Sequence, residues 1–485
     1  MEKYKLIFAV LILFVFSACS EDDLIVENLN EPDTERVLSN VEDFPGVIDG
    51  GYISFWQMQT RAEPNLVLAT VSDVLSCSWN NFGMNVYSSE PRVVYNNSPT
   101  SPFAGVGERA WNLGYGGVGA VNDVMRLLKE RDSAIIDGVD QKPMLLANGL
   151  FIQGTTFGHL AALYDRVYVV DETIPVSDLT SIPFPAEPNY MVAVDSAVSK
   201  LQQCIAICEA NDFVLWPTFM RGVGYDQDQL AKLAHTYIAR FKAYAARNAA
   251  ENTAADWAAV VDHASKGIDF DFVIVGDGSF WYDEFKAYGS FPGWVRVDQK
   301  TISLMDPSQP SRYPVDGTTD LGPATTDDAR LASDFTYVPT QNYNPGRGLY
   351  HYSNYRVSRY DDTHGFAGNM YLILQAENDL LQAEGLLMSG GSATDAAALI
   401  NNTRVGRGAL TALTGTESRD DLMAALKYER TIELILTSSL VSFADARRYE
   451  TMQEGTFTQF PVPGSDLELL GQALYTYPGG LSVSN

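Results

Sequence analysis

Residues 370–407 read MYLILQAENDLLQAEGLLMSGGSATDAAALINNTRVGR, and this stretch decides the predicted fold. Apolar side chains recur every three or four residues over 370–388 and again over 394–407, as on one face of an amphipathic helix. Between these two segments, the Ser-Gly-Gly-Ser of residues 389–392 offers a stop for the first helix and a cap for the second. The stretch therefore predicts a helical hairpin.

The same periodicity recurs on both sides of this hairpin. Apolar stripes lie at 194–208, 231–245 and 257–268, and a last helix is expected over about 420–436. Helix pairs with Ala at close-packed positions and short turns are typical of helical-repeat proteins, and the tetratricopeptide type fits best. The predicted fold class is mostly α.

Two long stretches do not fit helices. Residues 76–102 are rich in Asn, Ser and aromatic side chains, and residues 276–345 are rich in Gly, Pro, Asp and Tyr. Loops of this length in a compact protein are usually functional or disordered, and the many large rings argue against disorder. We expect an irregular, loop-rich layer over a helical scaffold.

Composition narrows the function classes. The 485 residues include 33 Lys and Arg but 61 Asp and Glu, for a net charge of −28. A surface this acidic repels phosphate backbones and anionic lipids, so binding to nucleic acid or to a membrane surface is disfavoured. The four cysteines are too few for a disulfide scaffold. Cys204 and Cys208 share one face of a predicted helix, without a second pair at zinc-site spacing, and are expected to be buried thiols.

The N-terminus has the parts of an export signal. Two lysines precede an apolar run at 6–18, and Phe-Ser-Ala-Cys at 16–19 resembles a bacterial lipobox. In that interpretation residues 1–18 are a signal peptide, and Cys19 carries acyl chains such as palmitate that anchor the protein. The alternative is a secretory signal cut elsewhere, with Cys19 incidental.

Domain boundaries follow from this interpretation. The acidic run Ser-Glu-Asp-Asp at 20–23 resembles the surface-export tag of some Gram-negative lipoproteins, although a solvated tether has the same composition. We expect a lipidated acidic tether and lead-in over 19–49, and a single domain over 50–485. Contact with the membrane is expected through the N-terminal lipid only.

Known catalytic motifs are not present in the sequence. Residues 114–119 match G-x-G-x-x-G, but no buried strand precedes them, so close-packing glycines in a helix are the better interpretation. No G-x-S-x-G elbow, phosphate-binding loop or H-E-x-x-H pair occurs. We expect no catalytic residue, no metal and no cofactor.

Aromatic side chains in the two irregular stretches carry the best functional signal. The first cluster is Trp79-Asn80-Asn81-Phe82, and the second contains Trp281 and Tyr282 with Trp294 farther along. Flat apolar rings beside amides or carboxylates suit stacking on the C–H face of a sugar. The alternative is that these rings hold long loops to the scaffold.

Several motifs, taken in order, resemble the SusD/RagB family of outer-membrane nutrient-binding lipoproteins. The resemblance rests on Trp111, Tyr115, Asn122 and Asp123, on Ala383-Glu384, on Glu-Arg-Thr-Ile-Glu-Leu at 429–434, on Phe-Ala-Asp-Ala-Arg-Arg-Tyr at 443–449, and on Pro-Val-Pro at 461–463. The chain departs from the family pattern at Thr431 and at the Thr-Ser-Ser-Leu of residues 437–440. These departures put local ion pairing in question.

The resemblance implies a SusD-like fold of four tetratricopeptide-like helix pairs with an irregular ligand-binding overlay. It implies an outer-membrane lipoprotein on the extracellular side, without catalysis, that captures an oligosaccharide for a SusC-like TonB-dependent transporter. Trp79, Asn80 and Asn81 fall where family members often place a stacking aromatic and its polar partner. Trp281, Tyr282 and Trp294 fall in the second variable region.

Other functions fit parts of this pattern. A related lid could bind oligopeptides, using backbone pairing and pockets. A surface glycoside hydrolase would need two carboxylates across a cleft, and Asp283 and Glu284 are the candidates beside the second cluster. A helical-repeat scaffold would bind no nutrient at all.

Overall fold

The computed structural model describes residues 38–77, 79–314, 319–339 and 352–477. The chain divides into two compact units, Met1–Phe44 and Pro45–Asn485, and the account below concerns the second. In the first unit the described part includes the short 3-10 helix Val41–Asp43. The predicted signal peptide, Cys19 and the acidic run lie outside the described residues.

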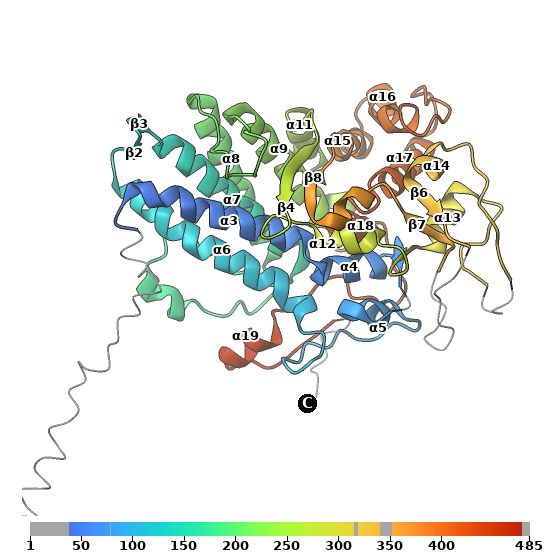
Figure 1. Ribbon diagram of the computed structural model, residues 1–485, viewed down its shortest axis with the longest axis horizontal. Coiled ribbons are helices and arrows are strands. Elements are labelled where there is room, and N and C mark those ends of the chain that lie inside the picture. The colour runs from blue at the N-terminus through green and yellow to red at the C-terminus, as the bar shows by residue number, and fades with distance from the viewer. Residues whose placement is uncertain (1–37, 78, 315–318, 340–351, 478–485) are drawn as a thin grey trace, which may run out of the picture. The chain divides into compact units, whose positions relative to one another are not determined.

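Helices dominate the Pro45–Asn485 unit (Figure 1). Each helix of the main series packs against the next: α6 on α7, α7 on α8, α8 on α9, α9 on α11, α11 on α15, α15 on α16 and α16 on α17. Their bounds are Gly105–Glu130 (α6), Lys142–Leu163 (α7), Tyr190–Ala210 (α8), Gln227–Tyr244 (α9), Trp257–Ser265 (α11), Gln375–Ser389 (α15), Ala393–Arg404 (α16) and Arg419–Glu433 (α17). The expected stacking of helix pairs is present in this series.

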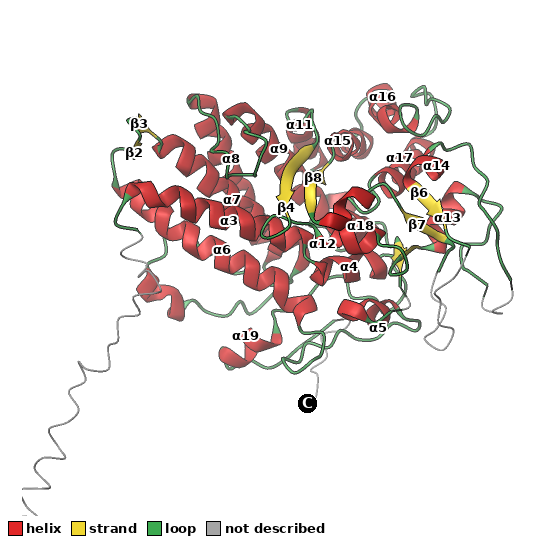
Figure 2. Ribbon diagram, in the orientation of Figure 1, coloured by secondary structure: helices red, strands yellow, loops and turns green. Residues whose placement is uncertain are grey.

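Further helices and several short strands complete the unit. The helices are α3 (Phe44–Thr60), α4 (Ala62–Val71), α5 (Met84–Ser88), α10 (Ala249–Ala254), α18 (Ser439–Arg448) and α19 (Gly464–Leu469). In the described part of the chain the strands are short and pair two by two, as Figure 2 shows. One such pair is β2 (Ile135–Ile136) with β3 (Val139–Asp140).

The N-terminal part of the predicted helix over 370–388 is wrong. Residues 370–373 belong to the strand β8 (Ala367–Ile373), and α15 begins only at Gln375. Strand β8 pairs with β4 (Phe272–Asp277), which lies almost a hundred residues earlier in the chain. A short apolar run is compatible with helix and strand alike, and this distant partner decides between them.

The glycine-rich segment at 114–119 is helical, as predicted, because it lies inside α6. A Cβ atom on Gly117 would come within 2.6 Å of the Cβ of Ser54 on α3. The two helices therefore approach too closely there for a larger residue.

Helix α8 is long and apolar enough to cross a membrane by length and composition alone. In the fold, however, it packs between α7 and α9 as a core helix. Cys204 and Cys208 lie on its buried side as free thiols, which confirms that prediction.

An insert of residues 266–374 separates α11 from α15, the two helices that would otherwise form a hairpin. It contains α12 (Glu284–Ser290), β5 (Arg296–Val297), α13 (Gln299–Met305), α14 (Arg330–Asp334), β6 (Phe335–Tyr337) and β7 (Tyr355–Val357), in addition to β4 and β8. The pairing of β4 with β8 closes the insert close to its two ends. In its described parts, the layer expected over 276–345 is indeed rich in loops, which connect these short helices and strands.

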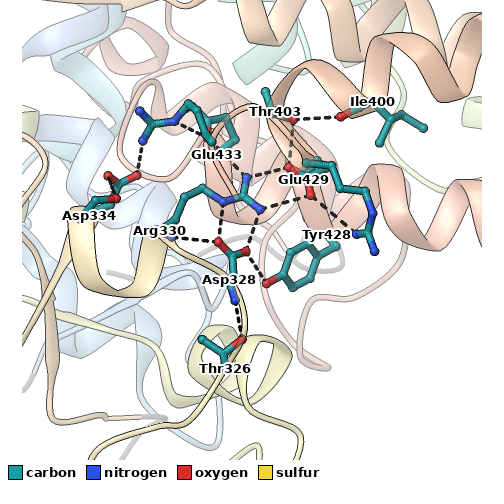
Figure 3. A network of polar contacts seen from close by, with 12 residues as sticks. Thr326, Asp328, Arg330, Asp334, Ile400, Thr403, Tyr428, Glu429 and Glu433 are labelled. Carbon is teal, nitrogen blue, oxygen red and sulfur yellow. Dashed lines mark hydrogen bonds and ion pairs between the residues drawn. The ribbon is translucent and has the colours of Figure 1, made fainter. Parts of the chain in front are cut away.

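A buried ion-pair network ties the insert to α17 (Figure 3). Arg330 donates to Asp328 at 2.7 Å, to Glu429 at 2.6 Å and to Glu433 at 3.3 Å, and its own side chain is fully buried. Tyr428 adds a hydrogen bond to Asp328 at 2.7 Å. Buried charges are tolerated only when they are paired in this way. Ion pairing around the Glu-Arg-Thr-Ile-Glu-Leu motif is thus extensive even with Thr431 in place.

Candidate functional site

Two short strands bring the two predicted aromatic clusters together. Strand β1 (Leu75–Ser76) pairs antiparallel with β5, with Leu75 opposite Val297 and Ser76 opposite Arg296. Because the strands run in opposite directions, the residues that follow β1 lie beside the residues that precede β5. Trp79 follows the first strand and Trp294 precedes the second.

Cys77 links these two tryptophans through their backbones. Its Sγ lies 3.2 Å from the carbonyl oxygen of Trp294 and 3.3 Å from that of Trp79, and it accepts a hydrogen bond from the Trp79 N–H at 3.3 Å. The thiol is buried, so the contacts form in a dry setting. Cys77 therefore holds the backbones of Trp79 and Trp294 close together.

Five rings form a continuous group that we call the aromatic surface: Phe82, Tyr288, Phe291, Trp294 and Phe366. Tyr288 stacks on Trp294 at 5.0 Å between centroids and on Phe82 at 5.9 Å. Phe291 meets Trp294 edge-on at 6.4 Å, and Phe366 meets Tyr288 edge-on at 5.9 Å. Phe291 is 44% exposed, and the other four are partly buried. The surface is therefore accessible from solvent and held in place by ring contacts.

The aromatic surface rests on a hydrophobic core. Phe82, Tyr288 and Trp294 all pack against the buried cluster that contains Leu75, Val297 and many others. A platform supported in this way loses little conformational entropy when a ligand stacks on it, which favours affinity.

Helix α12 presents Tyr288. Asp283 caps its N-terminus by accepting a hydrogen bond from the Lys286 N–H at 2.7 Å, and its carboxylate also pairs with the Lys286 ammonium at 2.9 Å. Phe285 is buried on the inner face of the same helix. Tyr288 follows three residues later, which places it toward the rim of that face.

Two of the rings sit on strained backbone. Phe82 has φ +56° and Phe366 has φ +54°, both in the left-handed region that residues other than glycine seldom occupy. Gly83 continues the bend at φ +79°, and a Cβ there would press on the ring of Tyr87 at 3.1 Å. Such strain persists only where the surroundings enforce it, and it gathers at functional sites.

Polar contacts beneath Phe366 hold its turn. Arg356 forms a bidentate pair with Asp361 at 2.6 and 2.8 Å and donates to the Ser290 carbonyl at 3.1 Å. His364 lies between Ser290, at 2.9 Å, and the ring of Phe291, at 5.3 Å between centroids. The turn 361–365 is thus fastened to the end of α12.

The predicted site residues occupy different depths. Trp79 is 42% exposed, and Asn80 and Asn81 are exposed beside it. Asn80 accepts a hydrogen bond from the Val86 N–H at 3.3 Å, which orders the loop. These three residues flank Phe82 at the edge of the aromatic surface.

Trp281 and Tyr282 differ from this group. Trp281 is only 3% exposed, and its ring packs 6.0 Å from that of Trp56. Tyr282 is partly exposed, stacks under the Arg61 guanidinium at 4.6 Å and touches Phe366 at 5.7 Å. In this structure Tyr282 extends the aromatic surface, whereas the face of Trp281 is covered by protein.

The two carboxylates considered for hydrolysis are both engaged. Asp283 is fully buried, and burial raises its pKa in spite of the neighbouring Lys286. Glu284 accepts from Arg61 at 3.0 Å with one oxygen and from the Ala62 N–H at 2.9 Å with the other. Within the described residues, moreover, no group of three or more His, Cys, Asp or Glu side chains could hold a metal ion.

The sequence-based list of site residues misses Tyr288, Phe291 and Phe366. A signal for the first two was present, because aromatic residues recur every third position at 285, 288, 291 and 294. Phe366 lies more than seventy residues beyond Trp294, and only the pairing of β4 with β8 carries it back. No local pattern could have revealed it.

Solved structures identify the arrangement of helices. A SusD-like carbohydrate-binding protein from Bacteroides fragilis matches with a TM-score of 0.60 at 14% identity, over 86% of this chain and 88% of that one. A SusD superfamily protein from Parabacteroides distasonis matches with a TM-score of 0.62 at 11% identity, over 90% and 99%. The chain has the SusD-like fold.

A further solved structure agrees with this fold, whereas two comparisons at the sequence level find no match. Surface glycan-binding protein A from Bacteroides uniformis is similar at a TM-score of 0.55 and 12% identity, over 85% of this chain and 89% of that one. No protein-family model matches the sequence, and no curated protein matches it either. The predicted SusD-like, mostly α fold is therefore confirmed by structure, at identities where only the fold is shared.

Proposed function

We propose that the protein captures oligosaccharides on its aromatic surface, outside the cell, and delivers them to a SusC-like TonB-dependent outer-membrane transporter. The observation that carries the proposal is the group of five mutually packed rings, accessible from solvent, on a SusD-like fold. Rings of this kind bind sugars through their C–H faces and give modest affinity, which suits a carrier that must also release its ligand. Trp79, Asn80, Asn81 and Tyr282 would add contacts at the edges.

Binding without hydrolysis is the favoured activity. A retaining or inverting hydrolase needs two free carboxylates across a cleft. Asp283 is buried against Lys286, and Glu284 is occupied by Arg61 and the Ala62 N–H. Neither side chain is available to a substrate in this arrangement.

The location is proposed from the N-terminal sequence. Acylation of Cys19 would anchor the chain, and the acidic run at 20–23 would direct it outward. Cells that express the wild-type chain should incorporate labelled palmitate into it, and the Cys19→Ser variant should not. Label that is retained in this variant would overturn the proposed anchor.

The binding test uses residues 20–485, which contain the whole Pro45–Asn485 unit. We would screen polysaccharides, oligosaccharides and peptide mixtures by tryptophan fluorescence and calorimetry. For a glycan that binds the wild type, the affinity should fall at least fivefold in Trp294→Ala and in Phe291→Ala, which corresponds to about 1 kcal/mol per ring. Phe184→Ala is the matched control, since this partly exposed ring lies outside the aromatic surface.

Each other outcome has a distinct meaning. A response to peptides alone would replace the glycan by an oligopeptide. Release of reducing ends from any glycan would point to hydrolysis instead. If no member of the panel bound, the result would contradict nutrient capture.

A further inference from the structure

A second potential binding site lies away from the aromatic surface. A cavity of about 400 Å³ opens among α13, α17, α18 and residues 72–74, which lead out of α4. This volume falls within the range of small-molecule pockets, roughly 300–1,000 Å³. None of its lining residues belongs to the aromatic surface.

The walls of the cavity are mostly apolar. Leu434, Ile435 and Val441 line it from within and are all at most 3% exposed, while Leu304 is 46% exposed. Hydroxyl groups in the walls already have partners within the protein. Thr431 donates to the carbonyl of Lys427 at 2.8 Å, and Ser442 donates to that of Ser439 at 3.1 Å. A sugar would find few partners there, whereas an aliphatic or aromatic body would bury its surface.

The charges around the cavity favour an anion. Its lining contains three cationic side chains, Lys300, Lys427 and Arg430, and two carboxylates, Asp73 and Asp445. Each carboxylate already has an arginine: Asp73 pairs with Arg92 at 2.6 Å, and Asp445 pairs with Arg430 at 2.7 Å and with Arg448 at 2.8 Å.

The two lysines are less fully compensated. The ammonium of Lys427 lies 4.2 Å from the centre of the Tyr449 ring, and within the described part of the chain it has no carboxylate at ion-pair distance. Lys300 donates to the Thr451 carbonyl at 2.9 Å and lies 4.0 Å from Asp73. A locally cationic rim on a protein with a net charge of −28 is a marked departure from its surroundings.

We infer that this cavity binds a small amphiphilic anion, with the apolar body among α13, α17 and α18 and the anionic head beside Lys427 and Lys300. The apolar walls account for the body, and the exposed Lys427 ammonium at the rim, which has no carboxylate at ion-pair distance among the described residues, accounts for the head. The inference does not depend on the proposed glycan capture, because the two sites share no residue.

The test uses residues 20–485 with two kinds of probe. The first is 8-anilinonaphthalene-1-sulfonate, followed by fluorescence. The second is the series of straight-chain carboxylates from butanoate to dodecanoate, followed by calorimetry, with the corresponding alcohols for comparison. Affinity should rise roughly three- to fourfold per methylene and then level off when the cavity is full. A rise without a plateau, or no binding of any probe, would overturn the inference.

Two variants locate the binding. Ala424→Trp places a large ring at an exposed lining position on α17. It should lower the affinity for octanoate at least tenfold without lowering the melting temperature. Lys427→Met keeps an aliphatic side chain but removes the charge. It should therefore lower the affinity for octanoate about fivefold and leave the affinity for 1-octanol unchanged. Lys266→Met, at an exposed lysine beside Asp262, is the control and should change neither. Undiminished octanoate binding in Ala424→Trp, or equal losses for acid and alcohol in Lys427→Met, would contradict the inference.

Discussion

Trp79 and Trp281 carry the same ring in opposite surroundings. Trp79 is 42% exposed at the edge of the aromatic surface, whereas Trp281 is 3% exposed and packs on Trp56. The Trp56 indole N–H also donates to the carbonyl of Tyr282 at 2.8 Å, so the ring pair fastens the start of α12 to α3. An exposed ring is available to a ligand, and a covered one contributes to stability.

Substitution of the two rings should separate these roles. Trp281→Ala should lower the free energy of unfolding by about 3–5 kcal/mol, because a buried ring is replaced by a cavity. Trp79→Ala should change it by less than about 1 kcal/mol while weakening a bound glycan. Urea titrations of both variants measure the difference. Equal stability losses would mean that Trp79 is structural as well.

The histidine pair between α9 and α11 predicts a pH dependence. The Nδ1 atoms of His235 and His263 lie 2.8 Å apart, which requires one ring to donate and the other to accept. Burial lowers the pKa of His235 to about 4, with His263 and Lys266 contributing, and burial lowers that of His263 as well. Burial thus favours the neutral form of both rings in the folded state.

The direction in which stability changes with pH follows from the difference between the folded and unfolded pKa values. An unfolded histidine takes up its proton near pH 6.5, whereas folded His235 has its pKa lowered to about 4, so stability is lost as the pH falls between these values. Urea titrations at several pH values should show this loss in the wild type and a smaller loss in His263→Asn. Identical pH profiles for the two proteins would contradict the prediction.

At the scale of the element, α17 depends on Arg330. Loss of this guanidinium would leave Asp328, Glu429 and Glu433 without their shared cation in a buried setting. Arg330→Met should therefore cost about 3–5 kcal/mol of unfolding free energy. Lys266→Met, which breaks an exposed pair with Asp262, should cost at most about 0.5 kcal/mol. Thermal melts of the two variants give the comparison, and a small shift in Arg330→Met would mean that the carboxylates find other partners.

The helical elements could be predicted from the sequence because their signal is local. Three predicted apolar stripes match observed helices. The stripe at 194–208 lies within α8, the one at 231–245 lies within α9 apart from its last residue, and the one at 257–268 lies largely within α11. Each pattern repeats over several turns, which makes it recognisable in the sequence. Strand β8 could not be predicted, since its partner β4 is distant. Trp281 and Trp294 look alike in sequence, and only tertiary packing decides which ring is covered. For the same reason the ring of Phe366 joins the site without any local signal.

At the scale of the whole molecule, charge predicts the class of glycan. The aromatic surface offers rings and few free charges, while the protein as a whole carries −28. The affinity for a neutral oligosaccharide should therefore vary less than about twofold between low and physiological salt. A polyanionic polysaccharide should be repelled at low salt and bind better as salt rises. Calorimetry across ionic strengths tests this, and tight binding of a polyanion at low salt would contradict it.

The insert leaves and re-enters the helix series at one place, although it also contacts α17 and β1 elsewhere. Asn378 on α15 donates to the Ala264 carbonyl at the end of α11, at 2.8 Å, and β4 pairs with β8 just beyond. Its two ends thus leave and re-enter the scaffold side by side, as at an inserted domain. Residues 266–374 could therefore behave as an exchangeable cassette. Recombination at these adjacent ends would move most of the aromatic surface in a single event, and ligand preference could diversify in combinations that keep the facing residues of α17 and β1 compatible with the insert.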